Sequence, residues 1–312
     1  MDESKFRRLL KEELSISYSE SARLIARAPH AYKKYRIKKA DGGFREISQP
    51  AKETKFVMHW VIDRFLKPLP VHESAAAYRK GASVKKNAAM HSSNSYLAKF
   101  DFKNFFPSIK ISDIERHLAL HGDRGLDERS VSEIARLCTI AHMEGKCLSI
   151  GSPASPFLSN SIMYDFDEKV SRWCAENALT YTRYADDLTF STNVKNLSFE
   201  VQGFLIEVIQ SLEYPAIELN ENKTVYASKK GHRRVTGVVL SNAGNVSLGR
   251  ERKREISSLL HKFRIGELSR EEVYRLQGLL GFANDVEPVF VERMRKKYGH
   301  DLLWRIMSLS RE

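Results

Sequence analysis

The stretch that decides the fold is YTRYADDLTFS, residues Tyr181 to Ser191. Two adjacent aspartates, Asp186 and Asp187, stand between two runs rich in β-branched and aromatic residues, which favour strands. Like charges repel, and strands normally contain few aspartates. The pattern predicts a strand, a tight turn and a second strand. The two adjacent carboxylates in that turn are unfavourable on their own, which indicates that they have a function.

A third carboxylate stands in an aromatic run upstream. The stretch SYLAKFDFKNFFPSI, residues 95–109, is apolar on both faces, which is typical of a buried central strand, and Pro107 is expected to end it. An ionised Asp101 in such a strand costs free energy unless a partner neutralises it. A divalent cation is the natural partner, and a tight turn facing the neighbouring strand would bring Asp186 close to Asp101.

The residues alone leave several interpretations open. Paired aspartates are common in ordinary turns, where Asp bonds its own backbone, so the Asp186–Asp187 pair by itself is weak evidence for a metal site. Together with a buried Asp101, the pair predicts two Mg²⁺ ions that activate an attacking hydroxyl and stabilise a leaving pyrophosphate. Polymerase, nuclease and nucleotide cyclase all remain open at this point.

The composition favours a nucleic-acid partner. The 312 residues include 51 Lys and Arg against 39 Asp and Glu, a net charge of +12, and residues 229–312 carry 18 of these basic residues against 10 acidic ones. The charged N-terminus does not read as a signal peptide, and no apolar run approaches the roughly 18 residues that span a bilayer. The three cysteines lack metal-ligand or redox spacing, so we expect reduced thiols in a cytoplasmic protein with no membrane partner.

The remaining periodicity mixes strands and helices. Hairpin strands are expected on either side of Asp41-Gly42-Gly43, and one further strand in VTGVVLS, residues 235–241. Residues 74–91 read as a basic loop. Helices are expected over 1–30, 52–69, 111–144, 157–173, 198–213 and from 249 onward. The pattern predicts an α+β fold with a helical, basic C-terminal region.

Tyr184-Ala185-Asp186-Asp187 resembles the YADD box of reverse transcriptases. Three further stretches resemble other blocks of that family, in the expected order: FDFKNFFPSI (100–109), GSPASPFLSN (151–160) and IELNENKT (217–224). Residues 87–91, NAAMH, resemble the NAxxH motif of bacterial retron reverse transcriptases, and Val235-Thr236-Gly237 resembles their VTG motif. The resemblance runs from about residue 35 to residue 300, and it is specific because ordered blocks and subfamily motifs occur together.

The pocket block departs from the family at one position. Relatives usually have Pro-Gln-Gly where this chain has Ser149-Ile150-Gly151, so Ile150 lacks a polar contact near the incoming nucleotide. We interpret the change as a variation in fidelity or nucleotide affinity, because all three carboxylates remain.

The resemblance implies a role for each carboxylate. Asp101 and Asp186 would hold two Mg²⁺ ions, Asp187 would complete the carboxylate set, and the backbone carbonyl of Phe102 would add a ligand. The cations would also explain the paired aspartates, because they neutralise the repulsion in the turn.

The resemblance also implies five residues that bind the incoming deoxynucleotide or the primer. Phe106 would exclude a 2′-hydroxyl by lying under the sugar, and Arg45 would clamp the triphosphate. Lys223 would neutralise or protonate the leaving pyrophosphate, Gly151 would admit the nascent base pair, and Tyr184 would pack against the primer terminus. Without the resemblance, the same residues read as core aromatics, solvated charges and a turn glycine.

RNA binding is implied for the NAxxH motif and the basic C-terminal helices. Asn87 and His91 would hold the cognate RNA or brace the fingers, and His91 reads equally well as a structural histidine. Eight basic residues would follow the phosphates of a duplex or an RNA stem: Arg250, Arg252, Lys253, Arg254, Arg293, Arg295, Lys296 and Lys297.

The fold implied by the resemblance is a right hand with fingers, an antiparallel-sheet palm and a helical thumb. We expect N-terminal helices and fingers over residues 1–95. The palm is expected over 96–240, with fingers and pocket elements interspersed around 111–160, and a basic helical thumb over 241–312.

The expected function is RNA-directed DNA synthesis in a retron. The enzyme would copy part of its cognate noncoding RNA into branched multicopy single-stranded DNA, primed from a guanosine 2′-hydroxyl. Its partners would be that RNA, the RNA–DNA product, dNTPs and an effector protein encoded nearby, in an antiphage defence system. Two alternatives remain: a reverse transcriptase of a group II intron or diversity-generating lineage, against which both subfamily motifs argue, and a catalytically silent RNA-binding scaffold, against which the intact carboxylates argue.

Overall fold

The computed structural model describes residues 3–38 and 42–310, which fold into two compact units. The first unit is built from segments within 1–80, 99–188 and 200–224. The second is built from segments within 81–98, 189–199 and 225–312. Both units therefore combine stretches that are far apart in the sequence, and the division into fingers, palm and thumb by sequence order stays a prediction.

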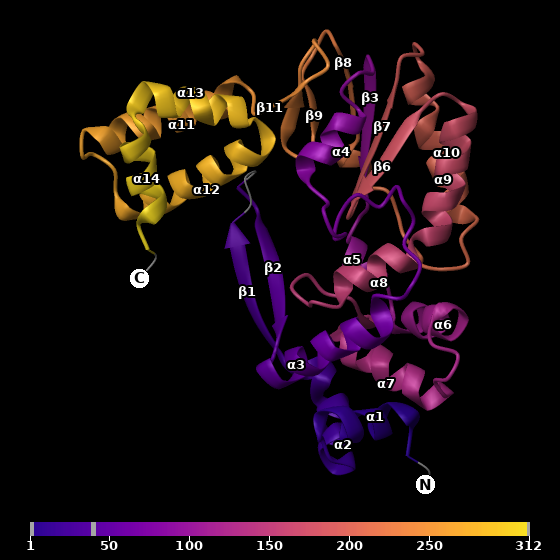
Figure 1. Ribbon diagram of the computed structural model, residues 1–312. Helices are drawn as coiled ribbons and strands as arrows, with labels where there is room; N and C mark the ends of the chain where they lie inside the picture. Colours follow the sequence, from indigo (N-terminus) through magenta and orange to yellow (C-terminus); the bar gives the residue numbers. More distant parts are fainter. Residues whose placement is uncertain (1–2, 39–41, 311–312) are drawn as a thin grey trace. The chain divides into compact units, whose positions relative to one another are not determined.

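Helices are the main regular elements of the first unit (Figure 1). Serine caps begin two of them, since Ser4 accepts from the backbone of Arg7, and Ser17 forms a reciprocal capping box with Glu20. The helices are α1 (Lys5–Leu14), α2 (Tyr18–Arg27), α3 (Lys52–Val61), α5 (Phe105–Ser108), α6 (Ile111–His121), α7 (Glu128–Cys138), α8 (Ser155–Ile162), α9 (Tyr164–Glu176) and α10 (Val201–Gln210).

Two antiparallel hairpins also belong to the first unit. Strands β1 (Tyr32–Lys38) and β2 (Phe44–Pro50) pair in the register Tyr35 opposite Ile47, as the sequence predicted on either side of the glycine turn. Asp41 of that turn lies outside the described residues. Strands β4 (Ile140–His142) and β5 (Gly145–Cys147) form the second hairpin, so the helical prediction over 111–144 is wrong after Cys138.

A four-stranded sheet carries the two carboxylate motifs. Its strand order is β6 (Thr180–Tyr184), β7 (Asp187–Thr192), β3 (Tyr96–Asp101) and β8 (Val225–Ser228). Helix α9 packs on β6, and α10 packs on α9 (Figure 1). The predicted buried strand is confirmed as β3, but it ends at Asp101, before Pro107, because Asn104 adopts a left-handed conformation with φ 49° and turns the chain into α5.

The second unit contains two elements that the sequence did not predict. Helix α4 (Val84–Met90) lies within the stretch expected to be a basic loop, and the Ser83 side chain caps it by accepting from the Lys86 backbone. The expected VTGVVLS strand is a hairpin of β9 (Arg233–Val235) and β10 (Val238–Leu240), with β11 (Val246–Ser247) on the far side of β10. Thr236 and Gly237 form the turn, with φ values of 45° and 82°.

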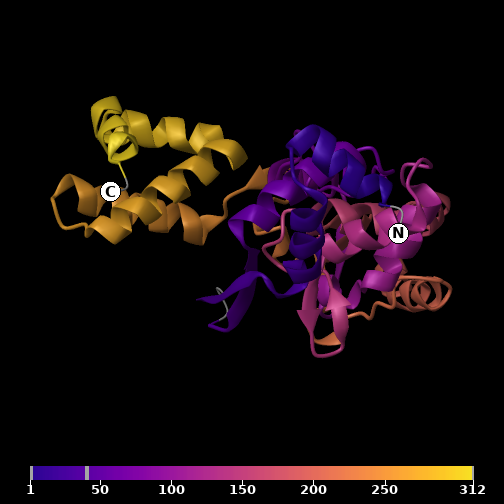
Figure 2. The same ribbon diagram turned by 90° about the horizontal axis from the view of Figure 1, so that it is seen from below.

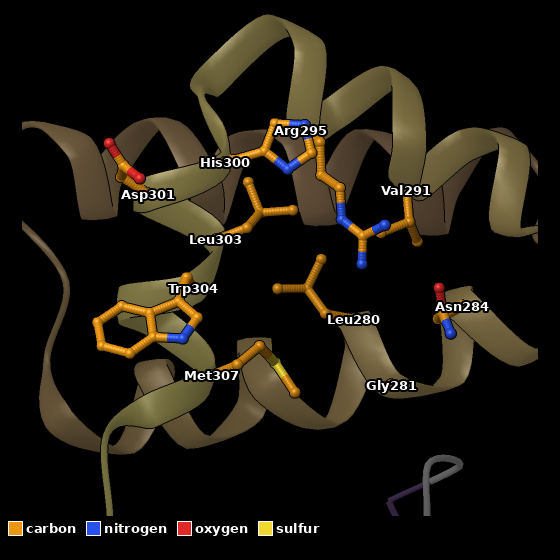
Figure 3. A pocket seen from close by; sticks show the side chains of 10 residues that line it. All are labelled: Leu280, Gly281, Asn284, Val291, Arg295, His300, Asp301, Leu303, Trp304 and Met307. Atoms are coloured by element: carbon orange, nitrogen blue, oxygen red, sulfur yellow. The ribbon is translucent and has the colours of Figure 1, made fainter.

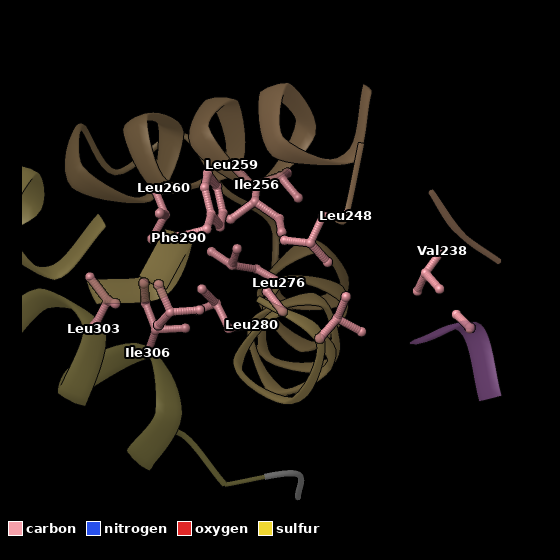
Figure 4. Close-up of a cluster of buried hydrophobic side chains, with 14 of the residues drawn as sticks. Val238, Leu248, Ile256, Leu259, Leu260, Leu276, Leu280, Phe290, Leu303 and Ile306 are labelled. Atoms are coloured by element: carbon pink, nitrogen blue, oxygen red, sulfur yellow. The ribbon is translucent and has the colours of Figure 1, made fainter. Parts of the chain in front are cut away.

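Four C-terminal helices complete this unit: α11 (Arg250–Arg264), α12 (Arg270–Val286), α13 (Pro288–Tyr298) and α14 (His300–Ser308). Figure 2 shows them, in orange to yellow, gathered into one group. One apolar cluster joins them to the small sheet and to α4, with Val238, Leu248, Ile256, Leu276 and Ile306 among its members (Figure 4). The predicted helical C-terminal region is confirmed, and it shares its core with the residues of both subfamily motifs.

Candidate active site

Backbone hydrogen bonds hold the end of β3 between two other sequence blocks of the first unit. The amide of Phe102 donates to the carbonyl of Asp186 at 3.2 Å, so the YADD turn lies directly against Asp101. On the other side, the amide of Asn220 donates to the carbonyl of Asp101 at 2.7 Å. Three stretches that the sequence separates by more than 30 residues therefore meet at Asp101.

A pocket of about 480 Å³ opens at this meeting point. Its size suits a small-molecule ligand such as a nucleotide. Asp101 and Asp186 line it together with Lys223, and the other residues on its wall include Lys34, Arg45, Tyr78, Phe102, Phe106, Ser149, Ile150 and Asn220. Of the residues that the sequence assigned to this site, Asp187, Gly151 and Tyr184 do not line the pocket.

The carboxylates repel one another in a partly dry environment. Burial raises the pKa of Asp186, and the neighbouring charges of Asp101 and Asp187 raise it further. Burial also raises the pKa of Asp187, while the positive charge of Lys99 opposes that shift. The site therefore has an excess of negative charge that favours binding of a cation.

Lys223 supplies part of the missing positive charge. Its Nζ donates to Asp101 Oδ1 at 2.7 Å. Burial alone would lower the pKa of Lys223, but the hydrogen bond and charge of Asp101 outweigh it and raise the pKa. The resemblance assigned this lysine to the leaving pyrophosphate, and the structure places it on the same pocket wall as Asp101 and Asp186.

The oxygen ligands at this site suit a divalent cation. Within residues 3–38 and 42–310, no three His, Cys, Asp or Glu side chains are grouped closely enough to hold a metal ion. Mg²⁺ commonly takes one or two carboxylates and completes its shell with water and phosphate oxygens. Asp101 and Asp186, with the adjacent Phe102 carbonyl, provide such a partial set of oxygen ligands.

The structure distinguishes the two aromatic residues of the NFFP stretch. Phe105 is buried and stacks on Phe102 with a ring-centroid distance of 5.4 Å. Phe106 is partly exposed on the pocket wall. Phe106 is therefore the more accessible ring for an incoming nucleotide.

Gly151 has a packing reason in addition to the role that the resemblance implied. Its φ is +107°, and a Cβ at this position would lie 2.8 Å from Ile47 Cγ2 and 2.9 Å from the Ser48 carbonyl oxygen. The adjacent Ile150 carbonyl accepts from the Ser48 amide at 2.7 Å. The glycine thus lets the pocket loop approach β2 closely, and contact with a nascent base pair stays a prediction.

The two subfamily motifs meet in the core of the second unit. The Thr236 hydroxyl donates to the Val84 carbonyl, and a nitrogen of the buried His91 ring bonds Ser191 Oγ at 2.8 Å. Asn87 is 2% exposed, and both polar atoms of its side chain lack a hydrogen-bond partner. Side chains this buried do not reach a surface ligand, and both roles, bracing the fingers and holding the cognate RNA, stay predictions for Asn87 and His91.

The basic C-terminal residues differ in how available they are to phosphates. Lys253 forms an ion pair within the second unit and is therefore less available to a phosphate. Its Nζ pairs with Glu287 Oε1 at 2.6 Å, and that carboxylate also accepts hydrogen bonds from Ser247 and Leu248. Arg252 lies over the Phe282 ring. Exposed positions, which suit phosphates better, are Arg250, Arg254, Arg293, Lys296 and Lys297.

A second pocket, of about 520 Å³, lies among α12, α13 and α14 (Figure 3). Leu280, Val291 and Leu303 form its apolar floor, and Trp304 lies at its edge with 71% of its surface exposed. Arg295 is the basic residue from the predicted RNA-binding set that lines it. This pocket carries no carboxylate pair and belongs to the other unit, so it is separate from the site at Asp101.

Sequence reasoning missed two residues of the first unit that bear on the site. Tyr78 lines the pocket with a left-handed φ of 61°, and burial followed by the charge of Asp186 raises its pKa. Arg183 is fully buried beside the YADD turn. The only local signal was a charged residue in a strand that is otherwise apolar and β-branched.

Comparison with known proteins identifies the class of enzyme. The sequence profile of the family described as reverse transcriptase (RNA-dependent DNA polymerase) matches residues 37–240. The chain therefore belongs to the reverse transcriptase family and is an RNA-directed DNA polymerase. Members of this family generally use divalent metal ions, which agrees with the surplus of negative charge at Asp101, Asp186 and Asp187.

Within the family, the chain is similar to retron enzymes over nearly its whole length. It is 38% identical over 291 residues to the retron Ec83 reverse transcriptase of Escherichia coli, covering 92% of this chain and 93% of the relative. It is 32% identical over 290 residues to the retron Ec73 reverse transcriptase of the same species, covering 90% and 91%. The subfamily that the NAxxH and VTG motifs predicted is thereby confirmed.

A solved structure supports the right-hand fold. Telomerase from Candida albicans, in complex with a TWJ fragment of telomeric RNA, matches with a TM-score of 0.50 and 12% identity, over 88% of this chain and 56% of that chain. The likeness shows the fold alone, and it confirms the predicted α+β right-hand architecture. No helix in the described part of the chain is long and apolar enough to cross a membrane.

Proposed function

We propose that this reverse transcriptase copies part of its cognate noncoding RNA into branched multicopy single-stranded DNA. Synthesis would start from the 2′-hydroxyl of a guanosine in that RNA. The observation that carries the proposal is the similarity to two retron reverse transcriptases across about nine tenths of the chain, combined with a pocket that holds Asp101, Asp186 and Lys223. The alternatives of another lineage or a silent scaffold have no comparable support.

The proposed cofactor is a pair of Mg²⁺ ions. Asp101 and Asp186 would hold them, with Asp187 and the Phe102 carbonyl completing the protein's share of the ligands. When bound, the ions supply activation of the attacking hydroxyl and charge stabilisation for the leaving pyrophosphate. The chain's own contribution is to hold the acidic groups close together, and the positive charge of Lys223, which bonds Asp101, opposes the rise in the pKa of Asp186.

The residues on the pocket wall suggest how a deoxynucleotide would be bound. Arg45 offers a guanidinium group for the triphosphate from the β2 strand, and the ring of Phe106 would leave no room for a 2′-hydroxyl. Lys223 would neutralise the negative charge that develops on the leaving pyrophosphate, or protonate it, because its raised pKa keeps the side chain protonated. Ile150 presents an apolar side chain where the family usually has a glutamine. Tyr184, which does not line the pocket, would contact the primer end.

The proposed RNA interface uses the exposed basic residues of α11 and α13, with a salt-dependent affinity typical of phosphate contacts. An effector protein encoded nearby and a role in antiphage defence belong to the same proposal by similarity to retron enzymes. We place the reaction in the cytoplasm, where the three free, buried cysteines would stay reduced.

The test is a reconstitution with defined RNA. Purified protein is incubated with RNA transcribed from the DNA that flanks its gene, together with dNTPs and Mg²⁺. The expected product is DNA covalently joined to RNA, which a 2′,5′-debranching enzyme separates. A matched RNA with a 2′-deoxyguanosine at the branch position should give no product. Unbranched DNA from both RNAs would disprove the priming proposal while leaving the polymerase activity intact.

A further inference from the structure

The strand that enters the YADD turn contains an arginine with no access to solvent. Arg183 is 0% exposed, three residues before Asp186, and it is one of the largest fully buried side chains of the protein. Burying a guanidinium group costs free energy unless every donor is used. The hydrogen-bond partners of the Arg183 guanidinium group therefore indicate which parts of the structure it stabilises.

Three residues accept hydrogen bonds from this guanidinium group: Asp167, Asn160 and Ala185. Its Nε and Nη2 donate to the two carboxylate oxygens of Asp167 on α9, at 2.9 and 2.6 Å. Its Nη1 donates to Asn160 Oδ1 on α8 at 3.1 Å, and also to the carbonyl of Ala185 at 3.2 Å. Tyr181 donates its hydroxyl to Asp167 at 2.7 Å. We call Asn160, Asp167, Tyr181 and Arg183 the arginine cluster.

The bond to Ala185 reaches the catalytic turn itself. Ala185 is a non-glycine residue with a left-handed φ of +59°, a strained backbone conformation. Its carbonyl belongs to the peptide that leads directly into Asp186. A fixed donor on this oxygen sets the plane of that peptide and therefore the direction in which the Asp186 side chain leaves the backbone.

The same cluster holds a second wall of the pocket. The backbone of Arg183 donates to the Ser74 carbonyl at 2.8 Å and accepts from the Ala76 amide at 2.7 Å. Asn160 donates its side-chain amide to the Ala77 carbonyl at 2.9 Å. These bonds fix the segment that ends at Tyr78, and Tyr78 lines the nucleotide-sized pocket.

We propose that Arg183 is a positioning residue for DNA synthesis: it holds the strained Ala185–Asp186 peptide in its working orientation and links that peptide to the segment before Tyr78. The inference rests on the proposed role of Asp186. Asp167 serves as the anchor, because its bidentate pairing aims the remaining donor of the guanidinium group at the turn. A lysine would keep the charge but, with a single ammonium, would not bridge Asp167, Asn160 and the Ala185 carbonyl in this planar arrangement.

The test compares Arg183→Lys with a matched change elsewhere in the same unit. Arg7 pairs with the buried Glu133 at 2.7 Å and has no bond to the turn, so Arg7→Lys weakens a comparable ion pair without touching the site. For each variant we would measure kcat and KM for dNTP on a primed RNA template, the melting temperature, and amide exchange in peptides covering residues 184–188 and α6.

The expected result is specific to the turn. In Arg183→Lys, kcat falls by roughly 10- to 100-fold, as expected for losing a charge-assisted hydrogen bond that orients a reacting group. Exchange in residues 184–188 rises while exchange in α6 does not. In Arg7→Lys the melting temperature falls, but kcat and the exchange of the turn stay near the values of the unmodified enzyme.

Two outcomes would overturn the inference. One is a folded Arg183→Lys enzyme with unchanged kcat and unchanged turn exchange. The other is a loss of activity that only parallels a general loss of stability, with exchange rising equally in α6. If Arg183→Lys does not fold, Asn160→Ser removes a single anchor and should still lower kcat several-fold with faster turn exchange; unchanged values there would refute the proposal. An Asp186→Asn enzyme that still makes DNA would instead refute the proposed role of Asp186.

Discussion

The burial of His91 gives a prediction that separates a structural brace from an RNA ligand. His91 is 0% exposed and bonds Ser191, and burial lowers its pKa from the ordinary 6.5 to about 3. A histidine with this shift stays neutral in the folded protein, while the unfolded chain takes up a proton below pH 6.5. Stability is therefore complete above that pH and is lost progressively as the pH falls towards 3.

The size of the effect follows from the two pKa values. At pH 5 the unfolded imidazole is almost fully protonated and the folded one is not, a difference of about 1.5 pH units that corresponds to about 2 kcal/mol of unfolding free energy. His91→Asn removes this titration. Between about pH 7.5 and about pH 5, the unmodified protein should therefore lose about 2 kcal/mol more than the variant.

The assay is urea unfolding at both pH values, followed by circular dichroism, with the exposed His59→Asn as the matched control. The control should lose as much stability as the unmodified protein. Another buried histidine, His117, whose pKa burial lowers to about 4, is present in all three proteins, so its contribution cancels. Equal pH-dependent losses in His91→Asn and the unmodified protein would refute the reasoning. So would an RNA affinity that depends on pH in the unmodified protein but not in the variant.

Three further predictions concern the pocket. Gly151→Ala should lower the free energy of unfolding by about 1 to 3 kcal/mol in urea titrations, because φ is +107° and the new methyl group would meet Ile47; an unchanged value would show that the loop shifts freely. Ile150→Gln should lower the KM for dNTP by roughly 3- to 10-fold in steady-state kinetics, the value of one added hydrogen bond, and an equal or higher KM would contradict the interpretation of this departure. Lys223→Met should lower kcat by roughly 100-fold at saturating dNTP without weakening template binding, whereas a pure rise in KM would assign Lys223 to ground-state binding alone.

The sequence predicted the parts of the site that are encoded locally. The strand, turn and strand around Asp186 follow from β-branched and aromatic runs that flank two aspartates, and β3 follows from an apolar run that contains Asp101. The order of the blocks then gave the family. These predictions agree with the structure because the pattern of each motif is contained within about ten consecutive residues.

The remaining features depend on contacts between distant residues. Arg183 reads as an exposed charge in a strand, and its burial depends on Asp167, which lies 16 residues earlier on a helix. Helix α4 was missed because its seven residues carry too short an apolar pattern, and it is stabilised by packing on the VTG hairpin. The hairpin was taken for one strand because the turn uses Thr236 at a positive φ, which β-branched residues seldom adopt.

We propose that DNA synthesis depends on the carboxylates of Asp101 and Asp186. The direct measurement is the rate of dNTP incorporation on a primed RNA template with Mg²⁺, for Asp101→Asn and Asp186→Asn beside Asp165→Asn, a carboxylate outside this pocket. We expect a loss of at least about 1,000-fold for the first two, because each removes several kcal/mol of charge stabilisation, and a rate within about twofold for the third. Retention of a tenth or more of the rate by either Asp101→Asn or Asp186→Asn would contradict it.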